Sequence, residues 1–270
     1  MRRITILVTA LLALSGCGSG ASTAPAGEFK VSDLAGDWQV AVPGQPGAAV
    51  LRLSADELRL RDRCDLSGGW VALPTGQFAT LIQAGTGDCL KSDGSGAPAW
   101  LRSAARMRAA GDGWDVLDAR GARVATLTPG TMPHLDGNLM ADDPVRLTAA
   151  DRERLDRVLP PLPAGVVPVT AEQLTGRWSP TPTAKPFAEF QPDGTYSGSD
   201  GCNGVTSRWI TDGAGQVAVT SGVSTLIGCE NLDLPSWFTG TRLSRTGDAL
   251  VFYDAAGHQA HRLVKAPPAP

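Results

Sequence analysis

Short runs in which apolar and polar residues alternate occur in both halves of the chain and predict β-strands. Residues 50–53 (VLRL) and 57–60 (ELRL) alternate with a period of two, the pattern of a strand that turns one face toward a core. In the second half, residues 188–190 lead into Asp193-Gly194, a hairpin signal because glycine tolerates the positive φ that a tight turn needs. Further strands are predicted at residues 207–210, 216–220, 249–253 and 258–264, with turns at 211–215 and 254–257.

Capping signals ahead of apolar residues predict one helix in each half. In residues 233–243, Asp233 is the expected cap and Pro235 stands in the first turn, where its missing N–H costs nothing. In residues 95–105, Ser95 is the expected cap. Each helix is expected to close over an otherwise β structure.

The long connection at residues 129–169 is rich in proline and contains a third helix signal. Thr148 and Asp151 have the spacing of a capping box, in which side chain and backbone at a helix start bond reciprocally. A weak apolar stripe follows at residues 155–159 and ends at Pro160. We expect a short helix here that packs on one half or bridges both.

The two halves are similar to each other at an offset of about 140 residues, which predicts one structural unit used twice. Residues 34–38 (LAGDW) match 174–178 (LTGRW), and the turn at 118–121 (DARG) matches that at 254–257 (DAAG). Six of the seven tryptophans fall into matched pairs, namely Trp38 with Trp178, Trp70 with Trp209, and Trp100 with Trp237.

Composition supports short strands joined by turns and argues against a nucleic-acid partner. The 270 residues include 32 glycines and 20 prolines, and they are enough for two modest domains. The net charge is −3, and removal of Arg2 and Arg3 with a leader would make it −5. A nucleic-acid-binding protein needs a basic face, so no such partner is expected.

The N-terminus has the order of features found in bacterial lipoprotein leaders. Arg2 and Arg3 precede an apolar run at residues 4–14, which is too short to span a hydrocarbon core about 30 Å thick. The run ends in LSGC, which resembles the lipobox and implies a leader at residues 1–16 and acylation of Cys17. An ordinary secretory leader with a chance cysteine is the alternative. Residues 17–28 are small and polar, as expected of a flexible tether on the extracytoplasmic face of the membrane.

The four remaining cysteines would lie in an oxidising compartment, where disulfides form. Four cysteines allow three pairings, and the repeat favours Cys64–Cys89 and Cys202–Cys229. Each bridge would close a loop of about 25 residues and stabilise the fold by roughly 3 kcal/mol. A zinc site is the alternative, but the chain has no Cys-x-x-Cys.

The second half resembles the META/HslJ-like domain family of bacterial envelope proteins. The resemblance is carried by Leu174-x-Gly176-x-Trp178, by Asp193-Gly194 and by the stretch at residues 201–204 (GCNG). It implies a small antiparallel β-barrel-like domain with one helix, an envelope or stress-associated role, and no catalytic residues. The first half departs from the pattern, because it has RCD at residues 63–65 where the family shows Gly-Cys-Asn.

Few residues are candidates for a binding site, and each has a structural alternative. Asn203 could bind a ligand, but Asn and Gly also suit a turn that presents Cys202. Trp178 and Trp237 could stack on a ligand, although core packing is the preferred interpretation. His258 and His261 are three apart on an expected strand, so they would point to opposite faces and could not easily share a metal.

No catalytic motif is present, and no cofactor is expected. The sequence therefore predicts a mainly β protein of two tandem META-like domains, at residues 29–128 and 170–265, with a linker at 129–169 and a loose tail at 266–270. We expect a non-enzymatic envelope lipoprotein held to the membrane through Cys17, with an envelope protein or glycan as partner. A carrier with a small apolar ligand inside a barrel, or a hydrolase of the envelope, is the alternative.

Overall fold

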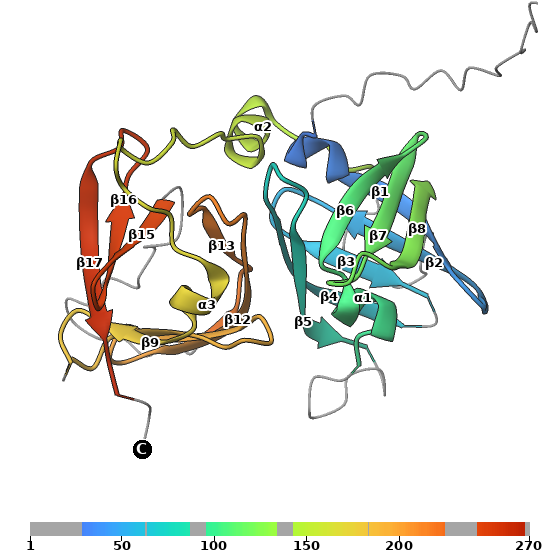
Figure 1. The fold of residues 1–270 in the computed structure, drawn as a ribbon. Coiled ribbons are helices and arrows are strands. Elements are labelled where there is room, and N and C mark those ends of the chain that lie inside the picture. The colour runs from blue at the N-terminus through green and yellow to red at the C-terminus, as the bar shows by residue number, and fades with distance from the viewer. Residues whose placement is uncertain are drawn as a thin grey trace, which may run out of the picture.

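The computed structural model of the chain describes residues 29–62, 64–86, 96–133, 143–182, 184–224 and 242–267. These residues form two antiparallel β-sheets, each curled toward a barrel, with few helices (Figure 1). The prediction of a mainly β protein with two barrel-like domains and a partly helical linker is thus confirmed.

The first domain is a sheet of eight strands in the order β5-β4-β3-β2-β1-β8-β7-β6. Its elements, in chain order, are a 3₁₀ turn η1 (Val31–Leu34), β1 (Gly36–Val42), β2 (Gln45–Leu53), β3 (Leu58–Arg61), β4 (Asp65–Ala72), β5 (Phe78–Gly85), helix α1 (Ala99–Ser103), β6 (Arg106–Ala110), β7 (Gly113–Leu117) and β8 (Arg123–Pro129).

The second domain repeats this order as β13-β12-β11-β10-β9-β17-β16-β15, with a short extra strand paired to β12. Its elements are α3 (Ala171–Leu174), β9 (Gly176–Ser179), β10 (Phe187–Phe190), β11 (Thr195–Ser199), β12 (Gly204–Thr211), β13 (Val217–Val219), β14 (Val223–Ser224), β15 (Arg242–Thr246), β16 (Ala249–Tyr253) and β17 (Gln259–Lys265).

Both sheets close in the same way. Strand β1 pairs with β8 and β9 pairs with β17, so the first strand of each domain lies beside its last. The ends of each sheet then meet at one isolated bridge, Gln77 with Arg106 in the first domain and Gln216 with Arg242 in the second. The predicted repeat is therefore present in the order of the strands as well as in the sequence.

Matched tryptophans make matched bonds, which explains their spacing in the sequence. The indole N–H of Trp38 donates to the Leu34 carbonyl over 2.8 Å, and that of Trp178 donates to the Leu174 carbonyl over 2.6 Å. Each bond ties the first strand of a domain to the short helical turn before it. The sequence analysis missed both turns, although Thr170 and Gln173 form a capping box at α3.

Each core is filled by large apolar side chains of the alternating strands. In the second domain Trp178, Phe190 and Phe252 are fully buried, and in the first domain Leu51, Phe78 and other residues are. Burial of apolar surface of this kind is the main favourable contribution to folding, at about 25 cal/mol per Å².

The predicted helices are found in part. Helix α1 begins after Pro98 and has only five residues; Ala105 lies beyond its end, and Ser95 lies outside the described residues. The expected helix at 233–243 falls mostly outside the described residues, but Leu243 lies in β15 and not in a helix.

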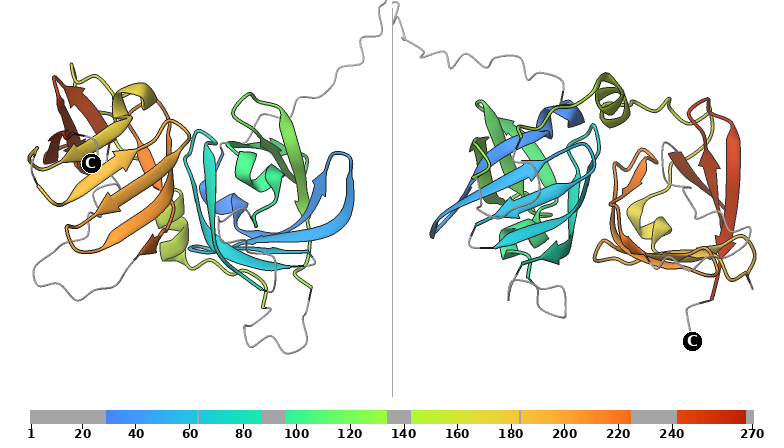
Figure 2. Two further views of the ribbon diagram at one scale, coloured as in Figure 1. Left: turned by 90° about the horizontal axis from the view of Figure 1, so that it is seen from below. Right: turned by 180° about the vertical axis from the view of Figure 1, so that it is seen from behind.

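The linker carries the helix expected of it, α2 (Ala149–Leu155), with the predicted capping box at Thr148 and Asp151. The helix ends at Leu155, before the apolar residues Val158 and Leu159. These two residues therefore do not share a helix face: Val158 is exposed and Leu159 is buried. Figure 2 shows the linker crossing from one domain to the other along one side of the molecule.

Candidate functional site: the cleft between the domains

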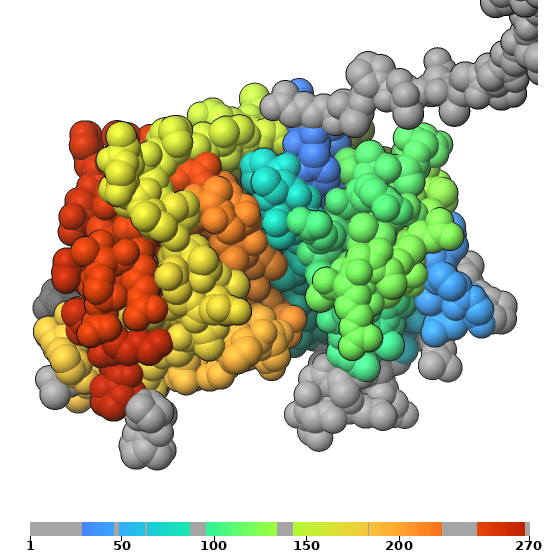
Figure 3. All heavy atoms as spheres, viewed as in Figure 1, coloured from blue at the N-terminus to red at the C-terminus, as the bar shows by residue number. Residues whose placement is uncertain are grey.

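The two domains contact one another along β4 and β5 of the first and β12 and β13 of the second. In Figure 3 these two surfaces meet directly. Across this contact the side-chain amide of Gln83 donates through Nε2 to the Ser221 carbonyl over 2.6 Å. At Gly69 the approach is so close that a Cβ atom would lie 2.3 Å from Ser221 Oγ and 2.9 Å from the Ser221 carbonyl oxygen.

A cleft of about 380 Å³ opens beside this contact and belongs to both domains. The first domain contributes the β2–β3 turn and the segment from Trp70 to Pro74, and the second contributes residues 216–219 and Ser221. The linker covers the cleft with Arg154, Leu155, Arg157 and Leu159. Its walls are thus mostly apolar, with two arginines at the linker side.

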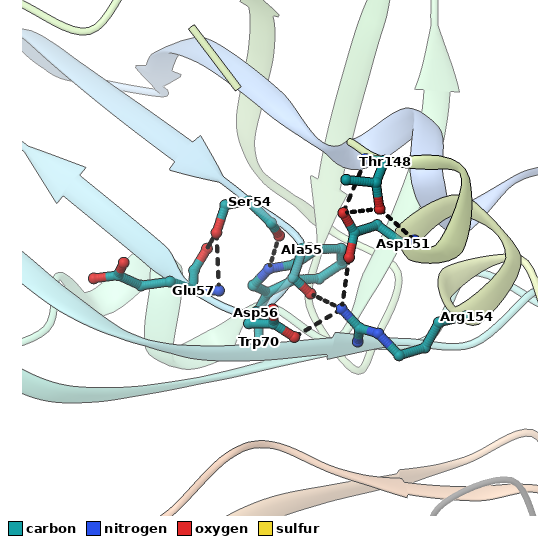
Figure 4. A network of polar contacts seen from close by, with 8 residues as sticks. All are labelled: Ser54, Ala55, Asp56, Glu57, Trp70, Thr148, Asp151 and Arg154. Atoms are coloured by element: carbon teal, nitrogen blue, oxygen red, sulfur yellow. Dashed lines mark hydrogen bonds and ion pairs between the residues drawn. The ribbon is translucent and has the colours of Figure 1, made fainter. Parts of the chain in front are cut away.

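Arg154 fixes helix α2 to the first domain (Figure 4). Its Nη2 donates to the carbonyl of Ala55 over 3.1 Å and to Oδ1 of Asp56 over 2.7 Å, and it lies 3.7 Å from Oδ1 of Asp151. The ion pair with Asp56 is exposed, so on its own it contributes at most about 1 kcal/mol. Its main effect is to fix where the helix stands over the cleft.

The β2–β3 turn that Arg154 contacts is also stabilised by a hydrogen bond from Trp70. The indole N–H of Trp70 donates to the Ser54 carbonyl over 2.9 Å. Across the turn the Ser54 hydroxyl accepts from the N–H of Glu57 over 3.1 Å (Figure 4). The matched Trp209 donates to the Gln191 carbonyl in the corresponding turn of the second domain, so this support is a property of the repeat.

Asp151 stabilises the start of α2 as an anion. The hydroxyl and the backbone N–H of Thr148 both donate to its Oδ2, over 2.7 and 2.9 Å. These hydrogen bonds, with a smaller effect of Arg154, hold the pKa of Asp151 below its usual value. The carboxylate is therefore charged at neutral pH and also favours the helix N-terminus.

The rest of the linker is held at both ends. On the first domain, Asp156 accepts hydrogen bonds from the backbone N–H and the hydroxyl of Ser32, over 2.8 and 2.6 Å. On the second, Arg242 donates to the carbonyls of Pro160 and Leu159, over 2.7 and 3.1 Å. The linker thus acts as a strap that fixes the width of the cleft.

The cleft has the chemistry of a binding site more than that of a catalytic one. Among the described lining residues the only carboxylate is Asp56, which is paired with Arg154, and no histidine is present. Arg157 is exposed and has no ion-pair partner in the described part of the chain. An exposed guanidinium beside an apolar wall can bind a carboxylate or phosphate through a fork of N–H groups.

The residues predicted from the sequence do not line this cleft. Asn203 is buried, with its N–H bonded to Oδ1 of Asp200 over 2.5 Å and its Nδ2 3.3 Å from Oδ2 of Asp200. Trp178 is fully buried beneath Lys265, so its ring cannot stack on a ligand from solvent. Cys17 and Trp237 lie outside the described residues.

Cys64 and Cys202 occupy matching turns at the start of matching strands. The N–H of Cys64 donates to Oδ1 of Asp62 and that of Cys202 donates to Oδ1 of Asp200, both over 2.7 Å. Their expected partners, Cys89 and Cys229, lie outside the described residues, so the pairing remains a prediction.

The described residues do not form a metal site of the kind considered from the sequence. No group of three or more His, Cys, Asp or Glu side chains there is placed to hold a metal ion. His258 lies 3.8 Å from Asp254 in the β16–β17 turn, whereas His261 lies against the ring of Phe252. Within the same residues, no helix is long and apolar enough to cross a membrane.

Of the polar residues that hold helix α2 and the domains around the cleft, only Thr148 and Asp151 were predicted from the sequence. The Asp200 turn was also missed, although an Asp two residues before a turn Cys is a readable signal for such a bond. Compared with known proteins, the chain matches no family model and no curated protein.

Proposed function

We propose that the protein is a non-catalytic lipoprotein of the bacterial envelope, and that the cleft between its two META-like domains binds an acidic envelope ligand. The membrane anchor is the acylated Cys17, and residues 18–28 form the tether. Bridges Cys64–Cys89 and Cys202–Cys229 brace the domains. The role is one of binding or envelope maintenance, including under stress.

The observation that carries the proposal is a cleft whose width is fixed by the hydrogen-bonded linker, with Arg157 at its edge making no ion pair to any described residue. A site that is already formed loses little entropy on binding, which favours affinity. The apolar walls and the guanidinium together suit a ligand with a carboxylate beside an apolar group, as in a peptide or a peptide-bearing glycan.

The carrier and hydrolase alternatives have less support. Side chains such as Trp178, Phe190 and Phe252 fill the second barrel, where a carrier would need space. Hydrolysis of a glycan would need two carboxylates about 5–10 Å apart across the substrate. The described cleft lining has one carboxylate, and that one is paired.

Anchoring is tested by the variant Cys17→Ser. We expect the wild type in the membrane fraction of bacterial cells, released by detergent and not by salt, and the variant outside that fraction. A variant that stays bound to membranes as the wild type does would exclude acylation of Cys17 as the anchor.

Binding in the cleft is tested with isolated peptidoglycan and its soluble acidic muropeptides as probes. Arg157→Ala should weaken binding by about tenfold, since a charged hydrogen bond contributes roughly 1.5–3 kcal/mol. The matched control is Arg152→Ala, an exposed arginine of the neighbouring helix α2 that does not line the cleft. Equal binding by wild type and Arg157→Ala would reject these ligands for this cleft.

A further inference from the structure

Because the two domains share one strand order, they can be compared position by position. They differ at the edge of the last strand of each sheet. Strand β6 is the last strand of the first sheet, and β15 is the last strand of the second. The two edges correspond residue for residue near the closing bridge: Met107 N–H donates to the Gly76 carbonyl over 2.8 Å, and Leu243 N–H donates to the Gly215 carbonyl over 2.7 Å.

In the second domain the edge of β15 is covered by the linker. Pro168 forms a bridge with Ser244, and the N–H of Val169 donates to the Leu243 carbonyl over 3.1 Å. Leu162 covers Gly215, since its Cδ1 would lie 3.3 Å from a Cβ built there. Residues 159–169 thus run past β15 as a segment rich in proline and apolar residues, with one turn in which the Val166 N–H donates to the Pro163 carbonyl.

In the first domain the corresponding place is a hollow of about 590 Å³. It is lined by β6 from Met107 to Ala109, by Gly76, and by Trp38 and Trp114. Phe29, the counterpart of Val169, packs edge-on against Trp114 with ring centroids 5.4 Å apart. A residue with the role of Leu162 is missing from the described part of this domain.

Two polar groups beside the hollow have no partner among the described residues. The indole N–H of Trp114 is buried without a hydrogen bond, although its ring lines the hollow. The side chain of Arg106, next to Met107 on β6, is exposed and makes no hydrogen bond or ion pair among the described residues, whereas its counterpart Arg242 donates to the carbonyls of Leu159 and Pro160. Carbonyl oxygens of a bound segment would satisfy donors of this kind.

We propose that the edge of β6 is a docking groove for a proline-containing apolar segment of a partner protein, which would lie there as residues 159–169 lie on β15. An exposed strand edge offers N–H and C=O groups for such an added strand, and the hollow beneath takes its apolar side chains. Proline suits the segment because it favours an extended backbone.

The chain's own N-terminal segment lacks the side chains that this role requires. Leu159 and Leu162 precede Val169 by ten and seven residues, and at the same distances before Phe29 stand Ser19 and Ser22. Residues 18–28 (GSGASTAPAGE) contain no large apolar residue at all. The occupant is therefore a segment of another protein.

The probe is a fluorescein-labelled peptide with the sequence of residues 158–169, VLPPLPAGVVPV, titrated into the purified full-length protein and followed by anisotropy. We expect saturable binding. A peptide in which serine replaces both leucines should bind about tenfold more weakly or worse, because two buried side chains are lost. No saturable binding, or equal binding of the two peptides, would overturn the proposal.

The site is assigned with matched variants. Ala109→Trp puts a large side chain into the hollow from an exposed edge position, and it should weaken binding about tenfold. Arg245→Trp, at the matching position of β15, should leave binding within about twofold. Thr75→Trp places a large side chain in the hollow from the opposite side. It replaces Ala109→Trp in this test if that variant does not fold, and the same loss of binding is expected. Loss of binding in Arg245→Trp alone would mean that the peptide displaces the linker, and would overturn the proposal.

Other occupants give different results. If deletion of residues 18–27 raised the affinity about tenfold, the chain's own tail would occupy the groove and the proposal would be wrong. Dimers that the peptide dissociates would identify a second copy as the occupant, again against the proposal. The groove is separate from the cleft, so Arg157→Ala should not change peptide binding, and each proposal can fail without the other.

Discussion

At the residue scale, one carboxylate organises the turn that presents each cysteine. Asp200 is buried and accepts from the N–H groups of Cys202 and Asn203, while exposed Asp62 accepts from that of Cys64. The N–H of Asn203, followed by that of Cys202 and the side chain of Asn203, lowers the pKa of Asp200 against the effect of desolvation. These bonds give Asn203 a structural role in the turn.

Replacement of Asp200 by Asn should make the second domain less stable in a way that depends on pH. A carboxyl group whose folded pKa is lowered stabilises the fold above its unfolded pKa, near 4, and this stabilisation is lost as the pH falls through the folded value. We expect the Tm of Asp200→Asn to lie below that of the wild type at about pH 7, and the difference to shrink as the pH is lowered toward about 2.

Thermal unfolding followed by circular dichroism at both pH values measures this difference. Asp62→Asn is the matched control and should lower Tm less, because Asp62 is exposed and makes one such bond. A Tm difference of the same size at both pH values would show that Asp200 does not act through its charge.

At the element scale, the indole-to-carbonyl bond ties a short helical turn to the first strand of each domain. Trp178→Phe removes this bond, leaves the Leu174 carbonyl without its partner and opens space in a filled core. We expect a loss of about 2–4 kcal/mol in the free energy of unfolding, measured by urea denaturation. Trp38→Phe should cost a similar amount, and a cost below about 1 kcal/mol in both would contradict the structural role of the pair.

Helix α2 depends on its cap, because none of its residues is buried. Thr148→Ala removes the hydroxyl that bonds Asp151, and a lost cap costs roughly 1 kcal/mol. Amide hydrogen exchange of residues 149–155 should become about five times faster, while Thr148→Ser should restore it. Unchanged exchange in Thr148→Ala would mean that contacts with the first domain hold the helix without its cap.

Local patterns in the sequence predicted elements, and matching patterns predicted the repeat, but neither could predict the cleft. Alternation predicted β2 and β3, and Thr148 with Asp151 predicted α2, because these signals lie within a few residues. The cleft depends on Arg154 with Asp56, 98 residues apart, and on Gln83 with Ser221, 138 apart. Exposed polar residues of this kind carry no periodicity that would mark them as partners.

At the scale of the whole molecule, the absence of a side chain at Gly69 lets the two domains meet. Gly69→Leu should separate them, because even its Cβ would lie too close to the backbone of Ser221. We expect a larger distance between spin labels at exposed positions Thr75 and Gln259, measured by electron paramagnetic resonance, with unchanged circular dichroism.

Gly204→Leu is the control for this experiment, since Gly204 is exposed and its nearest contact for a Cβ is at 3.9 Å. It should leave the distance as in the wild type. An unchanged distance in Gly69→Leu would show that the linker alone sets the arrangement of the domains.

The pairing of β1 with β8 and of β9 with β17 places the beginning and the end of each domain on neighbouring strands. A chain that enters and leaves at one place can be copied in tandem without breaking any existing strand pair. Gene duplication could therefore add the second domain in a single event, with only the connecting segment to be adapted. After such an event each copy can lose or change its surface residues separately. Among the described residues, the edge of β15 is covered by the linker and the corresponding edge of β6 is not.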